Sequence, residues 1–356
     1  MKQEKPEEGR HIDMEKLNFA CDYNQGAHPA ILRRMAENNF VCSGVYGDDA
    51  FSDSAREKIR EACQAPDADV WFLVGGTQTN AAVLDSILRP YEGVISAMTG
   101  HINIHEAGAI ERGGHKVLAL SGKDGRLSAD EILACWNTWA NDGNRDHVVM
   151  PGAVYLSHPT EIGTLYSLAE LESISRVCRQ NGLRLYVDGA RLAYALACPE
   201  NDITLPDLAR LCDVFYIGGT KCGALLGEAV VFPKHDTVPR FFSIIKQHGA
   251  VLAKGFVAGL QFDTLFTDNL YGEIGRSAIS SAKRIRSALR EKGYTLAFDA
   301  PTNQIFVLLD DGKLADLSQK VEMSFWEKPD PAHTTMRFVT SWATTVEDVD
   351  HLISVL

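Results

Sequence analysis

Two apolar runs, each closed by glycine and a charged residue, stand out in the hydrophobic pattern of the chain. Residues 185–196 read LYVDGARLAYAL, and residues 213–223 read DVFYIGGTKCG. A continuous apolar run is typical of a strand that is covered on both faces of a parallel sheet. Asp188 ends the first strand and Lys221 follows the second, and open α/β sheets bind ligands outside the carboxyl ends of their strands. The pattern therefore predicts that Asp188 and Lys221 face one pocket.

Strand and helix patterns alternate over most of the chain. Residues 70–74 are predicted to form a strand, which two glycines connect to a helix over 77–88. Ser128 and Ser167 each begin a capping box with a glutamate three residues later, which predicts a helix start at both places. Such alternation implies right-handed crossovers and a mainly parallel sheet with helices on both faces.

The pattern changes after the segment EAVVFPKHD. A long helical region over 240–289 is followed by short apolar strands and by a last helix that Thr345 caps. We therefore predict an α/β fold with two domains after a short polar lead. The lead comprises residues 1–18, the large domain with its mainly parallel sheet comprises 19–254, and a smaller C-terminal α+β domain comprises 255–356.

Composition narrows the class of partner and the compartment. The chain has 356 residues, of which 45% are hydrophobic and 23% charged, and its formal net charge is −12. An acidic protein of this kind is not expected to bind nucleic acid or an anionic membrane. The N-terminus lacks the apolar core of a signal peptide. The eight cysteines form no Cys-x-x-Cys pair and are expected to be reduced, which indicates a cytoplasmic protein.

The chemistry that needs a lysine and a carboxylate in one pocket is that of pyridoxal phosphate. A lysine amine forms a Schiff base with the cofactor aldehyde, while a carboxylate keeps the ring nitrogen protonated so that the ring withdraws electrons. Each residue by itself has a simpler interpretation. Asp188 is also explained as a helix cap, and Lys221 as a solvated loop lysine.

The turn between the predicted strand 70–74 and its helix suits a phosphate group. Gly76 and Thr77 lie where free backbone amides and the positive end of a helix dipole meet. The segment GGTQTN is not the GxGxxG motif of dinucleotide sites and lacks the lysine of a P-loop, so those ligands are set aside. Thr77 is also explained as an ordinary helix cap.

Histidines concentrate in the segment GHINIHEAGAIERGGHKV. A metal site is not predicted here, because His105 and the following glutamate lack the second histidine of the HExxH pattern. The segment contains His101, His105 and His115, and we expect instead that one imidazole packs flat on a planar ligand and that another carries a proton near neutral pH.

Two arginines and a tyrosine complete the candidate site. Arg191 follows Asp188 by three residues, and Arg337 lies in the predicted strand MRFVTSW. Two arginines at one site bind a carboxylate through forked hydrogen bonds, although each alone is also explained as a structural ion pair. Tyr46, in the loop VYGDDA, is explained equally by a ligand contact and by a turn.

Together these segments resemble the threonine aldolase branch of the β-eliminating lyases, within the aspartate aminotransferase-like (fold type I) pyridoxal phosphate enzymes. The resemblance runs from FACDYNQGAHP to MRFVTSW, and VDGARL is its most specific match. It implies that Asp188 pairs with the pyridine nitrogen and that Arg191 binds the substrate carboxylate. In GGTKCG it implies that Lys221 forms the Schiff base.

The same resemblance implies roles for the other candidates. Gly76 and Thr77 would bind the phosphate, and His101 would stack on the cofactor ring. Arg337 would be the second arginine for the carboxylate, and Tyr46 a further site residue. The segment KQHGAVLAKG replaces the family's arginine-bearing segment that reaches a neighbouring subunit's phosphate, and it offers Lys246 or Lys254 instead. Cys21, His105 and Cys222 also differ from the residues common in the family.

The activity implied is cleavage of a β-hydroxy-α-amino acid, L-threonine or L-allo-threonine, into glycine and an aldehyde. His105 or His101, directly or through water, is the candidate that takes the hydroxyl proton. The alternatives are a β-eliminating lyase or aminotransferase on the same scaffold, a protein that holds the cofactor without catalysis, and a metabolite-binding α/β protein. The resemblance also implies a homodimer or homotetramer with sites shared between subunits.

Overall fold

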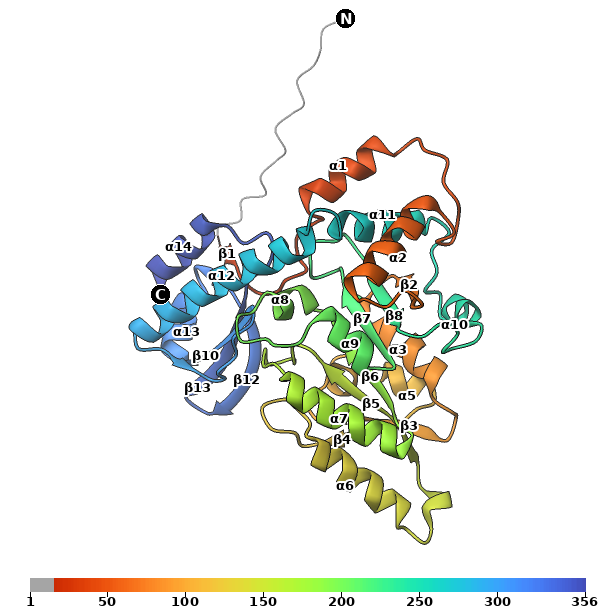
Figure 1. Ribbon diagram of the computed structural model, residues 1–356. Coiled ribbons are helices and arrows are strands. Elements are labelled where there is room, and N and C mark those ends of the chain that lie inside the picture. The colour runs from red at the N-terminus through yellow and green to blue at the C-terminus, as the bar shows by residue number, and fades with distance from the viewer. Residues whose placement is uncertain (1–15) are drawn as a thin grey trace, which may run out of the picture.

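A seven-stranded sheet forms the centre of the molecule in the computed structural model, which describes residues 16–356 (Figure 1). The strand order is β2-β8-β7-β6-β5-β3-β4, and β8 alone runs antiparallel to its neighbours. The prediction of a mainly parallel sheet is confirmed. Its strands are β2 (Asp69–Leu73), β3 (Glu92–Ala97), β4 (Val117–Leu120), β5 (Met150–Ser157), β6 (Arg184–Asp188), β7 (Val214–Gly218) and β8 (Glu228–Phe232).

Helices cover both faces of this sheet, because β5, β6, β7 and β8 are apolar along nearly their whole length. One core lies between the sheet and α1, α2, α6, α7, α8, α9 and α11, and a second lies under α3, α4, α5 and α10. The helices are α1 (Pro29–Glu37), α2 (Ala50–Ala62), α3 (Gly76–Ile87), α4 (His101–Ile104), α5 (Ala109–Arg112), α6 (Ala129–Ala140), α7 (Leu168–Asn181), α8 (Leu192–Leu196), α9 (Leu205–Leu211), α10 (Phe241–Gln247), α11 (Phe256–Leu265), α12 (Leu270–Glu291), α13 (Asp311–Leu317) and α14 (Val346–Val355), with a 3₁₀ helix at Arg145–His147.

The helix starts follow the local sequence. The capping boxes predicted at Ser128 and Ser167 are both formed, at the starts of α6 and α7. Helix α7 ends at Gly182, whose φ of 69° lies in the left-handed region that glycine adopts without strain. Thr345 caps α14 as predicted.

A second, antiparallel sheet lies beside the first and forms the smaller region of the fold. Its order is β12-β13-β10-β9, and α12 and α14 pack on it around a separate apolar core (Figure 1). A short parallel pair, β1 with β11, joins the start of the described chain to this region. These strands are β1 (Leu17–Asn18), β9 (Thr295–Leu296), β10 (Gln304–Asp310), β11 (Val321–Glu322), β12 (Ser324–Asp330) and β13 (His333–Val339).

The predicted long helical region over 240–289 is divided into α10, α11 and α12. Asp268 and Asn269 have φ of 49° and 59°, a conformation that these two residue types tolerate well and that no helix continues through. Helix α11 packs on α2, and its Asp263 accepts hydrogen bonds from Ser54 and Lys58 of α2. The division at residue 254 stays a prediction, and residues 1–15 of the predicted lead lie outside the described residues.

A buried ion pair ties the N-terminal segment to both sheets. Arg191, which precedes α8, donates from Nε and Nη2 to the two carboxylate oxygens of Asp22, over 2.7 and 3.1 Å. Asn303, just before β10 of the small sheet, donates from Nδ2 to Asp22 Oδ2 over 2.9 Å. The Asp22 carboxylate is fully buried, so its charge depends on these partners.

This pair predicts a large loss of stability in Asp22→Asn. The substitution leaves the Arg191 guanidinium buried without a counter-ion, which costs about 3–5 kcal/mol. Denaturant unfolding measures the effect. Asp350→Asn, which removes the exposed partner of Arg284, is the matched control and should change the free energy of unfolding by less than about 1 kcal/mol. Equal effects from the two substitutions would contradict a structural role for the buried pair.

Candidate active site

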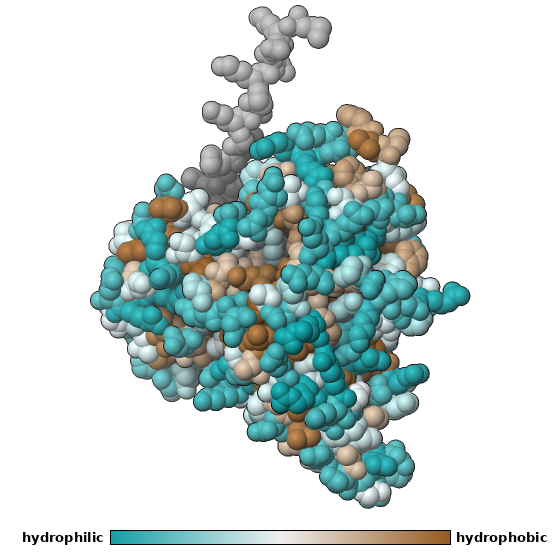
Figure 2. All heavy atoms as spheres, viewed as in Figure 1, coloured by the Kyte–Doolittle hydropathy of each residue, from teal (hydrophilic) through white to brown (hydrophobic). Residues whose placement is uncertain are grey.

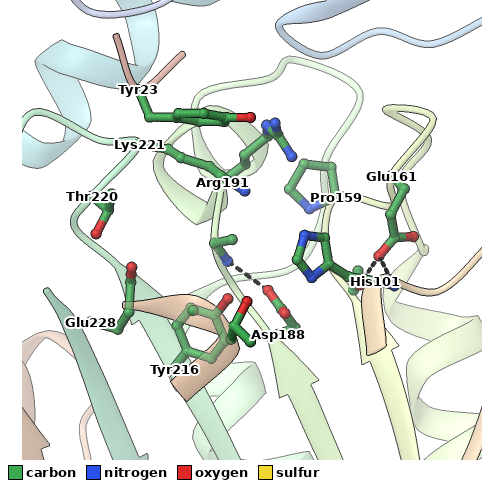
Figure 3. A pocket seen from close by; sticks show the side chains of 14 residues that line it. Tyr23, His101, Pro159, Glu161, Asp188, Arg191, Tyr216, Thr220, Lys221 and Glu228 are labelled. Atoms are coloured by element: carbon green, nitrogen blue, oxygen red, sulfur yellow. Dashed lines mark hydrogen bonds between the residues drawn. The ribbon is translucent and has the colours of Figure 1, made fainter. Parts of the chain in front are cut away.

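A cavity of about 240 Å³ opens where β5, β6 and β7 end and where α3 and β8 begin (Figure 3). This is the position at which open α/β sheets bind ligands. None of the helices in residues 16–356 is both long and apolar enough to span a bilayer. Side chains predicted for the site from three different strand ends meet here. The predicted residues that line the cavity are Gly76, Thr77, His101, Asp188, Arg191 and Lys221.

Asp188 ends β6 and is buried beneath the cavity. Its Oδ2 accepts hydrogen bonds from Tyr155 Oη over 2.6 Å and from Asn80 Nδ2 over 3.1 Å. Burial alone would raise the pKa of this carboxyl group, but the charge of His101 and the hydroxyl groups of Tyr155 and Tyr216 hold it below its usual value. Asp188 is therefore ionised at neutral pH and suited to hold a protonated ring nitrogen.

Lys221 lies at the tip of a tight loop between β7 and β8. The backbone of this loop folds back on itself, and the Gly227 carbonyl accepts hydrogen bonds from the amides of both Gly219 and Thr220. A Cβ at Gly219 would lie 2.5 Å from the Gly227 oxygen, so only glycine fits there. Removal from water, together with the charge of Arg191, lowers the pKa of the Lys221 amine. A larger fraction of that amine is then unprotonated and nucleophilic.

The first turn of α3 leaves backbone amides free. Its N-cap is Gly75, which offers no side chain to these amides, so the interpretation of Thr77 as the cap is wrong. A Cβ at Gly76 would lie 3.3 Å from Tyr216 Oη, closer than most real contacts. The Thr77 side chain and the N-terminus of α3 instead face the cavity, where they suit an anionic group.

His101 begins α4 and is held by a buried glutamate. Its Nδ1 lies 2.7 Å from Oε1 of Glu106, and Asn80 Nδ2 donates to the same oxygen over 2.7 Å. Because Asn80 Nδ2 also donates to Asp188, it links Glu106 to Asp188. Burial raises the pKa of Glu106, and the charge of Asp188 adds to that rise. Sequence reasoning missed Glu106, although it stands five residues after His101 in the same short segment.

His105 does not line the cavity. Its exposed ring stands beside His101, with 5.5 Å between ring centroids, and 6.1 Å from the ring of Trp326 in β12. Burial of part of the ring lowers its pKa, as do the positive charges of His101 and Arg337. The imidazole is therefore mostly neutral at pH 7.

The two predicted arginines differ in how they are paired. Arg191 lines the cavity, but its Nε and Nη2 are already bound to Asp22. Arg337 lies in β13 and is not among the residues that line the cavity; its Nη1 donates to Gln304 Oε1 over 3.0 Å, and its Nε is buried without a partner. Among residues 16–356, no carboxylate pairs with Arg337. Within this range its guanidinium therefore donates only to the neutral side chains of Gln304 and Ser324, which leaves its charge available to an incoming carboxylate.

Tyr46 and the two lysines named with the phosphate lie away from the cavity. Tyr46 has a φ of 57° and stands in the exposed loop between α1 and α2, where Lys246 Nζ lies 4.0 Å from its ring centroid. Lys254 is exposed. Within one chain, none of the three lines the cavity that holds Asp188 and Lys221.

Sequence reasoning missed several residues that line the cavity, among them Tyr23, Glu161 and Glu228. Tyr23 follows Asp22, and its ring centroid lies 5.7 Å from Lys221 Nζ. Glu161 follows β5, and Glu228 begins β8, where burial raises its pKa to about 7. Glu228 Oε2 accepts a hydrogen bond from the Gly219 amide over 3.0 Å. A charged residue at the end of an apolar strand was the available signal for Glu228, whereas a loop glutamate such as Glu161 carries none.

Comparison with known proteins agrees with this geometry. The model of the beta-eliminating lyase family matches residues 18–315. A low specificity L-threonine aldolase of Pseudomonas aeruginosa is 28% identical over 340 residues, which span 94% of this chain and 95% of the relative. The solved structure of a threonine aldolase of Leishmania major is 41% identical with a TM-score of 0.92, and the match covers 95% of this chain and 98% of that one.

A more distant structure shows the fold class. An aspartate aminotransferase of Thermus thermophilus is 15% identical with a TM-score of 0.68, over 96% of this chain and 90% of that one. The fold is thus the aspartate aminotransferase-like fold type I. The lysine amine, the ionised carboxylate and the free amides of α3 fit the aldehyde, ring nitrogen and phosphate of pyridoxal phosphate. The chain belongs to the β-eliminating lyase family, in its threonine aldolase branch, and its cofactor is pyridoxal 5'-phosphate.

Proposed function

We propose that this protein cleaves L-threonine or L-allo-threonine into glycine and an aldehyde by breaking the bond between Cα and Cβ. The threonine aldolase names of relatives at 28% and 41% identity support this substrate class. The observation that carries the proposal is the combination found in one cavity. It unites a lysine amine of lowered pKa, a buried ionised carboxylate and the free amides of a helix N-terminus.

The residues that hold the cofactor are proposed from their chemistry. Pyridoxal phosphate, when bound, supplies an electron sink for the bonds at the α carbon of an amino acid. Lys221 holds it through the nucleophilic amine, and Asp188 keeps the ring nitrogen protonated. Gly76 and Thr77 bind the phosphate at the N-terminus of α3. The His101 ring, which Glu106 fixes in orientation, packs on the ring of the cofactor.

The two arginines are proposed to bind the substrate carboxylate. Arg337 provides the stronger contact, because among residues 16–356 its guanidinium donates only to the neutral side chains of Gln304 and Ser324 and its buried Nε has no partner. Arg191 contributes from Nη1, since Asp22 occupies its other two donors. The carboxylate anchor fixes the α carbon beside Lys221.

His101 and His105 are proposed to exchange the hydroxyl proton of the substrate with solvent. His105 is exposed, adjoins His101 and is neutral near pH 7, which suits a group that passes protons between the cavity and water. His101 acts in addition through its packing on the cofactor. Both roles concern the step in which the β-hydroxyl group loses its proton.

Product analysis tests the function. L-Threonine or L-allo-threonine should give equal amounts of glycine and acetaldehyde, whereas β-elimination gives ammonia and a keto acid, and transamination gives a new amino acid. Arg337→Gln should lower kcat/KM by about 10- to 100-fold, because one charge-assisted contact to the carboxylate is lost. Arg284→Gln, at an exposed arginine of α12, is the matched control. Ammonia without glycine, or no product from either substrate, would contradict the proposal.

The histidine pair predicts a second kinetic effect. The double substitution of His101 and His105 by alanine should lower kcat by about 100-fold, the lower end of what positioned acid–base groups contribute. His351→Ala, on the exposed side of α14, should leave kcat unchanged. If the double variant turned over L-threonine at the wild-type rate, the proposed proton route through the histidines would be withdrawn.

A homodimer or homotetramer with shared sites is part of the proposal. Large apolar side chains gather in the loop after α1, where Phe40 is 95% exposed, and Figure 2 shows apolar atoms at this end of the molecule. The loop also carries Tyr46, with Lys246 against it. Assembly through this loop would bring Tyr46 and Lys246 toward the cavity of a neighbouring subunit. Tyr46 would contact the substrate there, and Lys246 or Lys254 would reach the phosphate.

Light scattering tests the assembly. The molar mass should be two or four times that of one chain, and Phe40→Asp should shift it toward the monomer, because a charge cannot be buried unpaired in an interface. A monomeric wild-type protein with full activity would contradict shared sites.

The cytoplasm is the proposed compartment. All eight cysteines are free thiols, and Cys63, Cys178 and Cys212 are buried, which suits a reducing environment. Cell fractionation that recovered the protein outside the cytoplasm would contradict this assignment.

A further inference from the structure

A buried glutamate in the cavity wall has no role in the function proposed above. Glu161 lies in the turn after β5 and is only 7% exposed, yet it lines the cavity beside His101. Figure 3 shows it on the other side of His101 and Pro159 from Lys221. Burial of an ionisable group costs free energy. A buried carboxyl group is therefore expected to have hydrogen-bond partners or a function.

One of its two oxygens is fixed by two hydrogen bonds, and the other accepts none from the side chains of the described residues. Oε1 accepts a hydrogen bond from the His101 amide over 2.9 Å and from Ser157 Oγ over 2.5 Å. Both of these hydrogen bonds go to the same oxygen, so Oε2 is the one that a proton can occupy. Burial raises the pKa of Glu161, and the negative charge of Asp188 adds to the rise, while the Ser157 hydroxyl opposes it. The carboxylate is thus oriented and more basic than an exposed glutamate.

Neither His101 nor His105 is as well placed as Glu161 to receive the hydroxyl proton of the substrate first. His101 Nδ1 is committed to Glu106, and its ring is assigned to packing on the cofactor. His105 is exposed and does not line the cavity. Glu161 is buried and oriented and, unlike Glu106, also lines the cavity on this side.

We propose that Glu161 is the catalytic base that takes the β-hydroxyl proton of the substrate as the Cα–Cβ bond breaks. This inference rests on the aldolase function proposed above and names the residue that performs its proton step. The O–H bond breaks and its proton goes to the Glu161 carboxylate, while the C–O bond becomes the carbonyl of the aldehyde. The electron pair of the broken Cα–Cβ bond stays with Cα, which takes up a proton to give glycine. Glu161 then returns its proton to solvent through the histidine pair.

The surroundings of Glu161 suit a group that gains and loses a proton. A proton on Oε2 leaves the hydrogen bond from the His101 amide to Oε1 in place. Ser157 Oγ also lies 3.2 Å from Tyr155 Oη, whose own hydrogen goes to Asp188. The single hydroxyl hydrogen of Ser157 can therefore turn from Glu161 to Tyr155 when the carboxyl group is protonated. The titratable groups that face Glu161 are His101, Tyr155, Tyr166 and Asp188.

Two reactions of the same enzyme separate this role from a structural one. Cleavage of L-threonine needs a base for the hydroxyl group, whereas exchange of the glycine α hydrogen with deuterated water involves no hydroxyl group. Glu161→Gln keeps the shape and the acceptor oxygen of the side chain. It should lower kcat for L-threonine by about 100-fold or more and leave glycine exchange, glycine affinity and the cofactor absorption band within about twofold of wild type.

The pH profile adds an independent readout. A base must be ionised, so wild-type kcat should fall as the pH drops through the raised pKa of Glu161, and Glu161→Gln should lack this acidic limb. Ser157→Ala removes a hydrogen bond that lowers that pKa and should move the limb to higher pH. Ser54→Ala, at a serine of α2 that binds Asp263, is the matched control and should not move it.

Three results would overturn the proposal. In the first, Glu161→Gln cleaves L-threonine at close to the wild-type rate. In the second, cleavage and glycine exchange fall together, which would make Glu161 a structural residue while the aldolase function stands. In the third, the wild-type enzyme exchanges the glycine hydrogen but cleaves no β-hydroxy amino acid, and then the proposed function fails as well.

Discussion

The rest of this structure depends on keeping ionisable side chains charged inside one buried cavity. Asp188 is a carboxylate removed from water, and it stays charged because of the charge of His101, the hydrogen bonds that Tyr155 and Asn80 donate to it, and the nearby Tyr216 hydroxyl group. Each donor comes from a different element of the large domain, so the position of the carboxylate depends on the packing of β5, β7 and α3 around β6. The pair of Arg191 and Asp22 obeys the same constraint.

The sheet satisfies this constraint by placing charged side chains only at strand ends. Asp188 ends β6, Glu228 begins the antiparallel β8, and Lys221 follows β7, and all three line the cavity. A network of hydrogen bonds then connects groups of different function. Asn80 joins Asp188 to Glu106, and Glu106 holds His101. A change in one carboxyl group is therefore expected to affect the orientation of the imidazole.

Local sequence patterns predicted most of the fold and part of the site. Asp188 and Lys221 were predictable because an apolar run that stops at a charge marks a strand end, and Gly76 because a strand, a glycine turn and a helix form a recognisable unit. The partners of these residues were not predictable. Asp22 and Arg191 are 169 residues apart, and Asn303 is further still, so only tertiary packing brings them together. Glu161 lies in a loop without periodicity, and Tyr46 stands outside the cavity of its own chain.

The role of Lys221 is the central claim, since every other assignment at the site depends on a cofactor held there. The most direct measurement is the absorption spectrum of the purified protein with pyridoxal phosphate, for the wild type and for Lys221→Ala. The account predicts a visible band of lysine-bound cofactor in the wild type, changed by added glycine, and no such band in the variant. The same band in both proteins, or in neither, would contradict it.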